Sequence, residues 1–127
     1  DAVRPNAATA QRPRPRRRQP RGGGVSALTL ARQVRELLAV PERWTQGAFA
    51  RHANGDPSFA TSPVAVRWCL HGAMRRASDG DISAATVEFC RIVGELTGMS
   101  IFKANDTMTH ADVLALLDRV ARMKERG

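Results

Sequence analysis

Apolar residues recur every three or four positions in several parts of this chain, which is the pattern of helices with one buried face. The first such run predicts a helix that begins near Ser26 or Thr29 and ends by Val40. Pro41 ends it, because proline disfavours helical geometry in the residue before it. The apolar stripe of this helix is Leu30, Val34, Leu37 and Leu38.

Two later runs predict helices in the second half of the chain. One spans about residues 82–97 and ends at Gly98, a residue type that readily terminates helices. The other opens at Thr109, and Asp112 three residues later completes an arrangement close to a capping box. The inward-facing residues of these two helices are Ala85, Phe89, Ile92, Val93, Leu96, Val113, Leu116, Leu117 and Val120.

A further helix is predicted to start at Ser62 and Pro63. Serine can cap the free amides of a first turn, and proline fits the first helical position without losing a needed donor. Arg75 and Arg76 fall in the last turn, where positive charge suits the helix dipole, and the Asp-Gly-Asp of residues 79–81 ends the helix. Its predicted inner face is Val64, Ala65, Trp68, Cys69, Leu70 and Ala73.

The stretches between these helices are less regular. Residues 42–61 alternate too briefly to separate a small hairpin from a loop, although residues 54–57 (Asn-Gly-Asp-Pro) predict a turn. Residues 100–108 are predicted to be a connector that contains Asn105 and Asp106. We therefore predict a mainly α fold: a small four-helix orthogonal or bundle-like domain, with one short hairpin within residues 45–61 as the expected departure.

The first 24 residues differ sharply in composition from the rest. They hold seven arginines, four prolines and one acidic residue, and so carry +6 of the chain's formal charge of +8. Proline blocks helix formation, like charges extend the chain, and few apolar side chains are present to offset the entropy of ordering. We predict a disordered Arg/Pro/Gly-rich arm at residues 1–24 and a helical domain at residues 25–127.

This arm carries the strongest indication of function. Arginine binds phosphate through forked, charge-assisted hydrogen bonds, and arginine-rich segments commonly become ordered on RNA. We expect the arm to bind the phosphate backbone of RNA or DNA, or another polyanion; the alternatives are a solubilising tail or a tether. No helix-turn-helix, zinc-finger or aromatic RNA-binding signature predicts sequence-specific recognition. The arginines expected to contact phosphate are Arg12, Arg14, Arg16, Arg17, Arg18 and Arg21.

Three segments form a distinctive combination. They are residues 44–51 (Trp-Thr-Gln-Gly-Ala-Phe-Ala-Arg) with 54–55 (Asn-Gly), residues 65–73 (Ala-Val-Arg-Trp-Cys-Leu-His-Gly-Ala), and residues 105–106 (Asn-Asp) with 111–113 (Ala-Asp-Val). Over roughly residues 28–122 they resemble a family of uncharacterised small bacterial and phage proteins, a domain of unknown function. Typical members have an aromatic residue where this chain has Ala104. The resemblance implies a compact domain and a bacterial or phage origin, and it carries no activity.

Trp44 and Trp68 each combine a large apolar body with one indole donor. One interpretation makes them core anchors that pack the irregular stretch onto the helix predicted after Ser62. The other makes them walls of a pocket with nearby polar side chains, since a concave site with a few polar groups is what a ligand requires. The residues of this candidate pocket are Trp44, Gln46, Arg51, Arg67, Trp68, Asn105 and Asp106. Asp106 and Asp112 would also allow an acid/base pair, but helix capping explains both carboxylates.

The sequence predicts no catalytic set and no metal site. Cys69 falls in the middle of a predicted helix, on its apolar face, and points away from His71 two residues later. A small buried hydrophobe is therefore the expected role of Cys69, and equally of Cys90. The histidines and cysteines are scattered, without C-x-x-C or H-x-x-x-H spacing, so we expect no metal and no cofactor.

Three functional hypotheses follow. The first is a non-catalytic nucleic-acid-associated structural protein that works with protein partners in a larger assembly, such as a phage particle or a ribonucleoprotein. The second is a protein-interaction adaptor that acts through the helical domain near Trp44 and Phe49. The third is an enzyme with a pocket near Trp44, Trp68 and Asp106. No apolar run is long enough to cross a bilayer, so we expect no membrane partner and a location in the bacterial cytoplasm or a phage particle.

Overall fold

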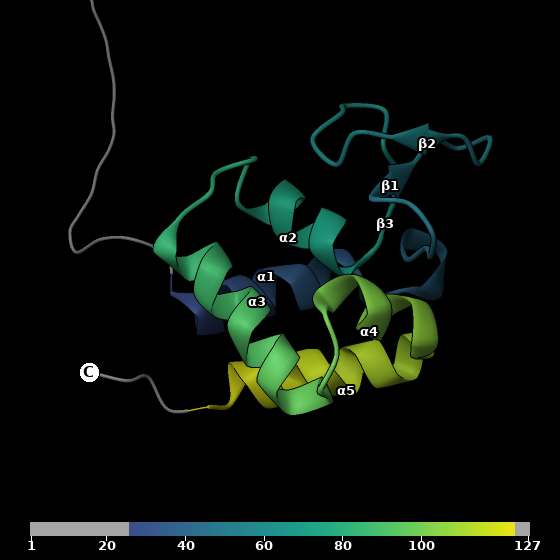
Figure 1. Cartoon of the computed structure of the whole chain (residues 1–127). Helices are drawn as coiled ribbons and strands as arrows, with labels where there is room; N and C mark the ends of the chain where they lie inside the picture. Colours follow the sequence, from purple (N-terminus) through teal and green to yellow (C-terminus); the bar gives the residue numbers. More distant parts are fainter. Residues whose placement is uncertain (1–25, 124–127) are drawn as a thin grey trace, which may run out of the picture.

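The computed structural model describes residues 26–123 (Figure 1). The prediction of a mainly helical fold is confirmed, but this part of the chain holds five α-helices rather than four. They are α1 (Ala27–Leu37), α2 (Leu70–Ala77), α3 (Ala84–Thr97), α4 (Ile101–Thr107) and α5 (His110–Ala121). None of these helices is both long and apolar enough to cross a membrane.

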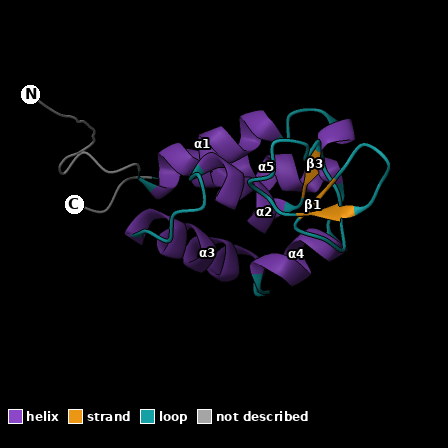
Figure 2. Cartoon of the chain, turned by 90° about the horizontal axis from the view of Figure 1, so that it is seen from above, coloured by secondary structure: helices purple, strands orange, loops and turns teal. Residues whose placement is uncertain are grey.

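Helix α1 is the centre of the domain. It packs against α2, α3 and α5, and Ala31, Val34 and Leu38 are fully buried there. The helix begins after Ser26, one of its two predicted starts, and the Ser26 hydroxyl caps it by accepting a hydrogen bond from the Thr29 amide at 3.1 Å. In the view from above, the strands lie at the end of the domain opposite the first residues of α1 (Figure 2).

A small antiparallel sheet lies beside α2 and α4. Its strands are β1 (Ala50–Arg51), β2 (Pro57–Ser58) and β3 (Arg67–Trp68), in the order β2-β1-β3. Ala50 pairs with Ser58 on one side and with Trp68 on the other. The short hairpin expected within residues 45–61 is therefore present, and β3 adds a strand that the sequence pattern did not indicate.

The helix predicted to start at Ser62 begins instead at Leu70, with Cys69 as its N-cap. The Ser62 hydroxyl does accept a hydrogen bond from the Val64 amide at 3.3 Å, but the bond closes an isolated turn. The Val66 amide then bonds the Arg51 carbonyl at 2.9 Å, which draws the next residues into the sheet. A long-range strand pairing thus overrides a local helix-start signal.

The predicted connector at residues 100–108 is also wrong, because α4 occupies most of it. The Ser100 hydroxyl caps this short helix by accepting a hydrogen bond from the Lys103 amide at 3.1 Å. Ile101, Ala104 and Asn105 are buried, which is the spacing of one helical face. The Asn-Asp pair therefore lies within a helix rather than in a turn.

The predicted C-terminus of α3 and the predicted N-terminus of α5 are both confirmed. Helix α3 stops at Gly98, whose φ of 71° is the left-handed conformation that glycine adopts without strain. Helix α5 opens with a complete capping box, in which Thr109 and Asp112 each accept a hydrogen bond from the other's backbone amide. Helix capping is therefore the structural role of Asp112.

Candidate functional site

Asn105 fastens the segment before the sheet to α4 and α2. Its buried Oδ1 accepts hydrogen bonds from the Trp44 indole at 2.7 Å and from the Leu70 amide at 3.0 Å. Its Nδ2 donates to the Thr45 carbonyl at 3.0 Å and to Asp106 Oδ1 at 3.3 Å. One amide side chain thereby satisfies polar groups from three separate segments of the chain.

Gln46 and Asp106 extend this attachment along α4. The Gln46 side-chain amide donates to the backbone carbonyls of Asn105 at 3.0 Å and Met108 at 3.2 Å, both near the end of the helix. In return, the Gly47 amide donates to Asp106 Oδ1 at 3.1 Å. The structure thus brings Trp44, Gln46, Asn105 and Asp106 together, and their polar atoms bond to one another and to the backbone.

Arg51 is similarly occupied by the backbone around it. Its guanidinium donates to Thr45 Oγ1 at 2.9 Å, to the Gly55 carbonyl at 2.8 Å and to the Gln46 carbonyl at 3.0 Å. These bonds close the hairpin turn onto the segment that precedes the sheet. A phosphate or carboxylate ligand would have to compete with three internal acceptors for this guanidinium.

Trp68 and Arg67 each hydrogen-bond to the backbone of a segment near the sheet. Trp68 is buried, and its indole donates to the Ala60 carbonyl at 2.9 Å, while the Arg76 guanidinium lies 5.5 Å from its ring centroid. Arg67 donates to the Glu42 carbonyl at 3.2 Å. Trp68 thus has the core-anchor role predicted for it.

Phe49 is fixed by an unusually close approach of its backbone to α2. The Phe49 carbonyl accepts a hydrogen bond from the Cys69 amide at 3.1 Å. A Cβ atom built on Gly72 would lie only 1.8 Å from the same carbonyl oxygen. Only glycine fits at position 72, and the contact sets where the Phe49 side chain emerges.

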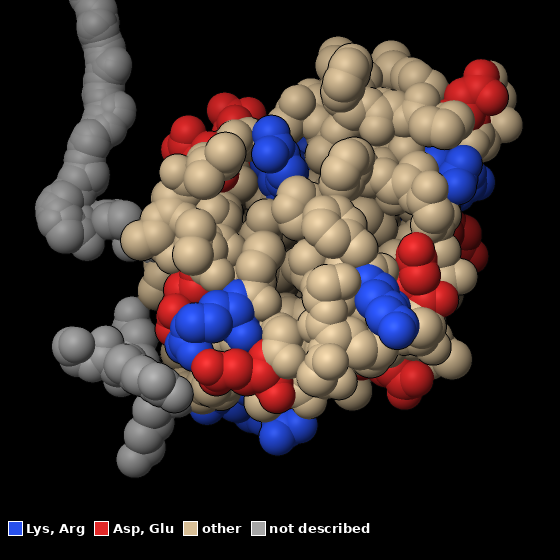
Figure 3. Space-filling view, in the orientation of Figure 1, with Lys and Arg blue, Asp and Glu red and all other residues tan. Residues whose placement is uncertain are grey.

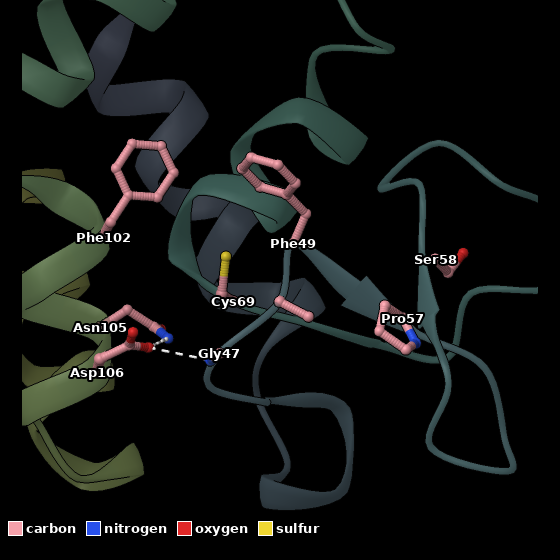
Figure 4. Close-up of a pocket in the computed structure, with 9 residues that line it drawn as sticks. Gly47, Phe49, Pro57, Ser58, Cys69, Phe102, Asn105 and Asp106 are labelled. Atoms are coloured by element: carbon pink, nitrogen blue, oxygen red, sulfur yellow. Dashed lines mark hydrogen bonds between the residues drawn. The ribbon is translucent and has the colours of Figure 1, made fainter.

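A hollow of about 420 Å³ opens between Phe49 and α4 (Figure 4). Cys69 lies at its base between Phe49 and Phe102, and the Asp106 carboxylate lies at its rim. Of the seven residues of the predicted pocket, only Asn105 and Asp106 line this hollow. Its full lining is Gly47, Ala48, Phe49, Pro57, Ser58, Cys69, Phe102, Asn105 and Asp106.

Three aromatic rings meet above the hollow. His71 lies 5.4 Å from Phe49 and 4.6 Å from Phe102 between ring centroids, and the two phenylalanine rings meet edge to face at 5.8 Å. A second hollow of about 260 Å³ is also lined by Phe49, together with Phe59, His71 and Arg75. We call Phe49, Phe59, His71 and Phe102 together the aromatic surface.

Phe59 and Phe102 were not among the site residues predicted from the sequence. Phe102 follows the inward-facing Ile101, so a helix at residues 101–107 would have placed it on the outer face. Because residues 100–108 were predicted to be a connector, this argument for an exposed Phe102 was not available. Phe59 follows the hairpin, where no periodicity exists to assign a face.

Cys69 does not lie in mid-helix, as predicted, but at the N-terminus of α2. Its Sγ accepts a hydrogen bond from the Gly72 amide at 3.3 Å, which on its own favours a thiolate. Burial has the larger effect and raises the pKa of the Cys69 thiol above its ordinary value. The predicted role of a small buried group is retained, and neither Cys69 nor Cys90 is in a disulfide.

His71 is held in its neutral form. Burial, reinforced by the positive charge of Arg75, lowers the pKa of its imidazole below the ordinary value. Its buried Nδ1 has no hydrogen-bond partner among residues 26–123. The ring therefore contributes mainly as an aromatic surface at neutral pH.

The lowered pKa of His71 makes the domain less stable in acid. The folded state binds fewer protons than the unfolded state, so stability falls as the pH drops through the unfolded pKa of about 6.5. His71→Phe keeps an aromatic ring and removes the titration. Urea unfolding at pH about 5 and about 7.5 should therefore show a smaller acid loss for the variant than for the natural chain. Equal losses would contradict a lowered pKa.

The phosphate-contacting arginines proposed from the sequence, Arg12 to Arg21, lie outside the described residues. Within residues 26–123, no group of three or more His, Cys, Asp or Glu side chains is arranged to hold a metal ion. The described site is therefore an aromatic surface with two hollows, supported from below by the Asn105 network.

The chain belongs to a family of unknown function, DUF6197, whose family model matches residues 24–123. The match covers the whole described domain, including the Asn105 network and the aromatic surface. No curated protein and no solved structure matches the chain.

Proposed function

We propose that this member of a family of unknown function is a non-catalytic nucleic-acid-associated protein. Its arginine arm holds the phosphate backbone of RNA or DNA within a larger assembly, such as a phage particle or a ribonucleoprotein of bacterial or phage origin. The observation that carries the proposal is the separation of charge. Residues 1–24 hold +6 of the formal +8, whereas residues 26–123 contain eleven basic and ten acidic side chains.

The arginines of the domain support this assignment because several already have internal partners. Arg35 forms an ion pair with Asp118 at 2.7 Å, and Arg76 donates to the Ser62 carbonyl at 2.8 Å. Arg51 and Arg67 hold the loops around the sheet through backbone carbonyls. The arm, by contrast, holds seven arginines and a single acidic residue, Asp1, which is the usual composition of a polyanion-binding segment.

Removal of residues 1–24 is expected to abolish most binding to generic RNA and DNA and to leave the fold intact. Each arginine that neutralises a phosphate releases a counterion, so affinity depends on salt. With all seven arm arginines on a single strand, the log–log slope approaches about −5, from about −0.7 per contact. Fluorescence anisotropy across a salt series measures the slope for both chains.

Two controls separate charge from folding. Changing Arg12, Arg14, Arg16, Arg17, Arg18 and Arg21 to glutamine in the full chain removes the charge at constant length and should match the deletion. The far-UV circular dichroism and melting temperature of both variants should equal those of the natural chain. Strong binding by the deletion chain at moderate salt would refute the proposed role of the arm.

A protein-interaction adaptor is the second candidate, favoured by one specific observation. Phe49, Phe59 and Phe102 are exposed large apolar side chains on neighbouring segments, and Trp44 is only half-buried. Exposed apolar surface of this kind commonly marks an interaction site. In that case the arm serves only as a tether, and the function lies in the domain.

An enzyme is the weakest of the three hypotheses. Burial raises the pKa of the Cys69 thiol, so the group stays protonated at neutral pH and is a poor nucleophile. The tryptophans proposed for a catalytic pocket do not line either hollow of the aromatic surface. These features support a binding role.

A further inference from the structure

We propose that the aromatic surface stacks unpaired bases, so that the chain binds single-stranded nucleic acid in preference to duplex. The inference rests on the proposed role of the arm in holding phosphate. It adds a second nucleic-acid contact, base stacking on the folded domain, which is tested separately from phosphate binding by the arm.

The exposure of the aromatic rings is the first argument. Phe59 is 84% exposed, Phe49 49% and Phe102 47%, whereas Phe89 and Trp68 are buried. An exposed ring contributes little to the core. It can, however, present its face to a base, and every base has a π face of its own.

The arrangement of the rings suits successive bases. Phe49 lines both hollows, with Phe102 beside it in the first and Phe59 beside it in the second. Because Phe49 and Phe102 meet edge to face, their planes differ by 69° and the rings do not cover one another's faces. A flexible single strand can place unstacked bases in such hollows, whereas the bases of a duplex are stacked on each other.

Polar groups at the rim match the edges of bases. Asp106 uses Oδ1 for the Gly47 amide and for Asn105, and no donor within residues 26–123 reaches its Oδ2. A carboxylate oxygen of this kind accepts a hydrogen bond from an exocyclic amino group, as on cytosine or adenine. Its negative charge also disfavours a phosphate there, which assigns bases rather than backbone to the first hollow.

Positive charge borders the same surface. Arg75 lines the second hollow, and Lys103 follows Phe102 on the exposed part of α4. Figure 3 shows a mostly uncharged tract between α2, α4 and the sheet, with separate charged side chains around it, including a basic one over α4. Bases on the uncharged tract and phosphates at the basic margin are the two parts of single-strand binding.

The arm is long enough to bind the same strand. An extended chain covers about 3.3 Å per residue, so the fourteen residues from Arg12 to Ser26 span up to about 45 Å. A domain of this size has a radius of gyration of about 13 Å. Although α1 starts at the end of the domain away from the sheet, the arm can therefore reach a strand that lies on the aromatic surface (Figure 2).

The test compares three probes with the full-length chain: a short single strand, an abasic strand of the same length, and a duplex. The abasic strand keeps the phosphates and lacks the bases. The natural chain should bind the base-bearing strand about tenfold more tightly than the abasic strand, within the range known for one stacked base. Phe59→Ala/Phe102→Ala should lose this preference and keep the affinity for the abasic strand and its salt slope.

Two further variants make the result specific. Ile82→Ala/Val87→Ala removes two exposed apolar side chains, one just before α3 and one in its first turns, and should leave the preference unchanged. Phe59→Leu/Phe102→Leu keeps an apolar surface without aromatic rings. It should lose the preference as the alanine variant does, whereas a docking site for an apolar protein segment would tolerate leucine.

The outcomes separate this inference from the proposed function. A natural chain that binds abasic and base-bearing strands equally, or phenylalanine variants that retain the preference, would overturn base stacking and leave the surface to a protein partner. Loss of binding to the abasic strand when the six arm arginines become glutamine supports the phosphate-binding role of the arm. Unchanged binding in that variant refutes this role, and the preference for base-bearing strands still decides the role of the aromatic surface.

Discussion

Gly72→Ala is expected to destabilise the domain by about 3 kcal/mol or more, or to prevent folding, although alanine is normally the better helix former. A Cβ at this position would lie 1.8 Å from the Phe49 carbonyl oxygen and 2.7 Å from the carbonyl carbon. No rotamer relieves the overlap, because both the Cβ and the opposing atoms belong to rigid parts of the chain. Either α2 or the Phe49 backbone must move.

Neither movement is local. The Phe49 carbonyl bonds the Cys69 amide, the N-cap of α2, and the next residue, Ala50, pairs with both Ser58 and Trp68. Displacing Phe49 therefore disturbs the centre of the sheet. Displacing α2 instead disturbs its packing on α1 and α4, where Leu70 and Ala73 are fully buried.

Gly94→Ala is the matched control, since Gly94 also lies inside a helix. The nearest atom to a Cβ there is the Met99 carbonyl oxygen at 3.7 Å, an ordinary contact. This substitution should stabilise the domain by up to about 1 kcal/mol. Urea unfolding followed by tryptophan fluorescence measures both variants. A Gly72→Ala protein within about 1 kcal/mol of the natural chain would show that the close approach is not a feature of the folded protein.

The contrast between the two glycines illustrates what the sequence can predict. Helices α1, α3 and α5 follow from it because their caps and apolar stripes are local, as with Ser26, Gly98 and the Thr109–Asp112 box. The start of α2 does not follow, because the Ser62 signal is overridden by pairing with β1, which lies at some distance along the chain. Nothing in the residues around Gly72 indicates that it packs against the Phe49 backbone.

The candidate site shows the same division. Trp44, Gln46, Asn105 and Asp106 were grouped from the sequence as a candidate pocket, and the structure shows them hydrogen-bonded to one another and to the backbone. A polar cluster near a tryptophan looks alike in sequence whether it binds a ligand or fastens a loop. The exposed rings of Phe59 and Phe102 depend on which face of an element is buried, and that is a property of the packed domain.

Asn105→Ala is expected to lower the free energy of unfolding by about 3 kcal/mol. Asn105 is almost fully buried, and truncation removes two acceptor and two donor contacts at once. The Leu70 amide is then left buried without a partner, and the Trp44 indole and Thr45 carbonyl lose theirs. A buried polar group without a partner costs about 1–3 kcal/mol, and water that enters the vacated space offsets part of the sum.

A loss of this size is a large share of the stability of a small domain, so the melting temperature should fall by more than about 10 °C. Asn54→Ala is the control, because Asn54 is exposed and its side chain bonds, within the described residues, only Asp56, two residues away. That variant should lose less than about 1 kcal/mol. Thermal and urea unfolding of the two variants compares a long-range network with a local turn.

The Asn105→Ala variant also tests the aromatic surface, because the Asn105 hydrogen bonds hold the helices α4 and α2 that carry Phe102 and His71. Asn105 lies one helical turn beyond Phe102 on α4, and through Leu70 it holds the first turn of α2, which carries His71. An Asn105→Ala chain that stays folded at low temperature should therefore also lose preference for base-bearing strands while keeping its arm-dependent salt slope. Equal stability losses for Asn105→Ala and Asn54→Ala would instead mean that the Asn105 side chain contributes little to holding the loop and α2 to α4.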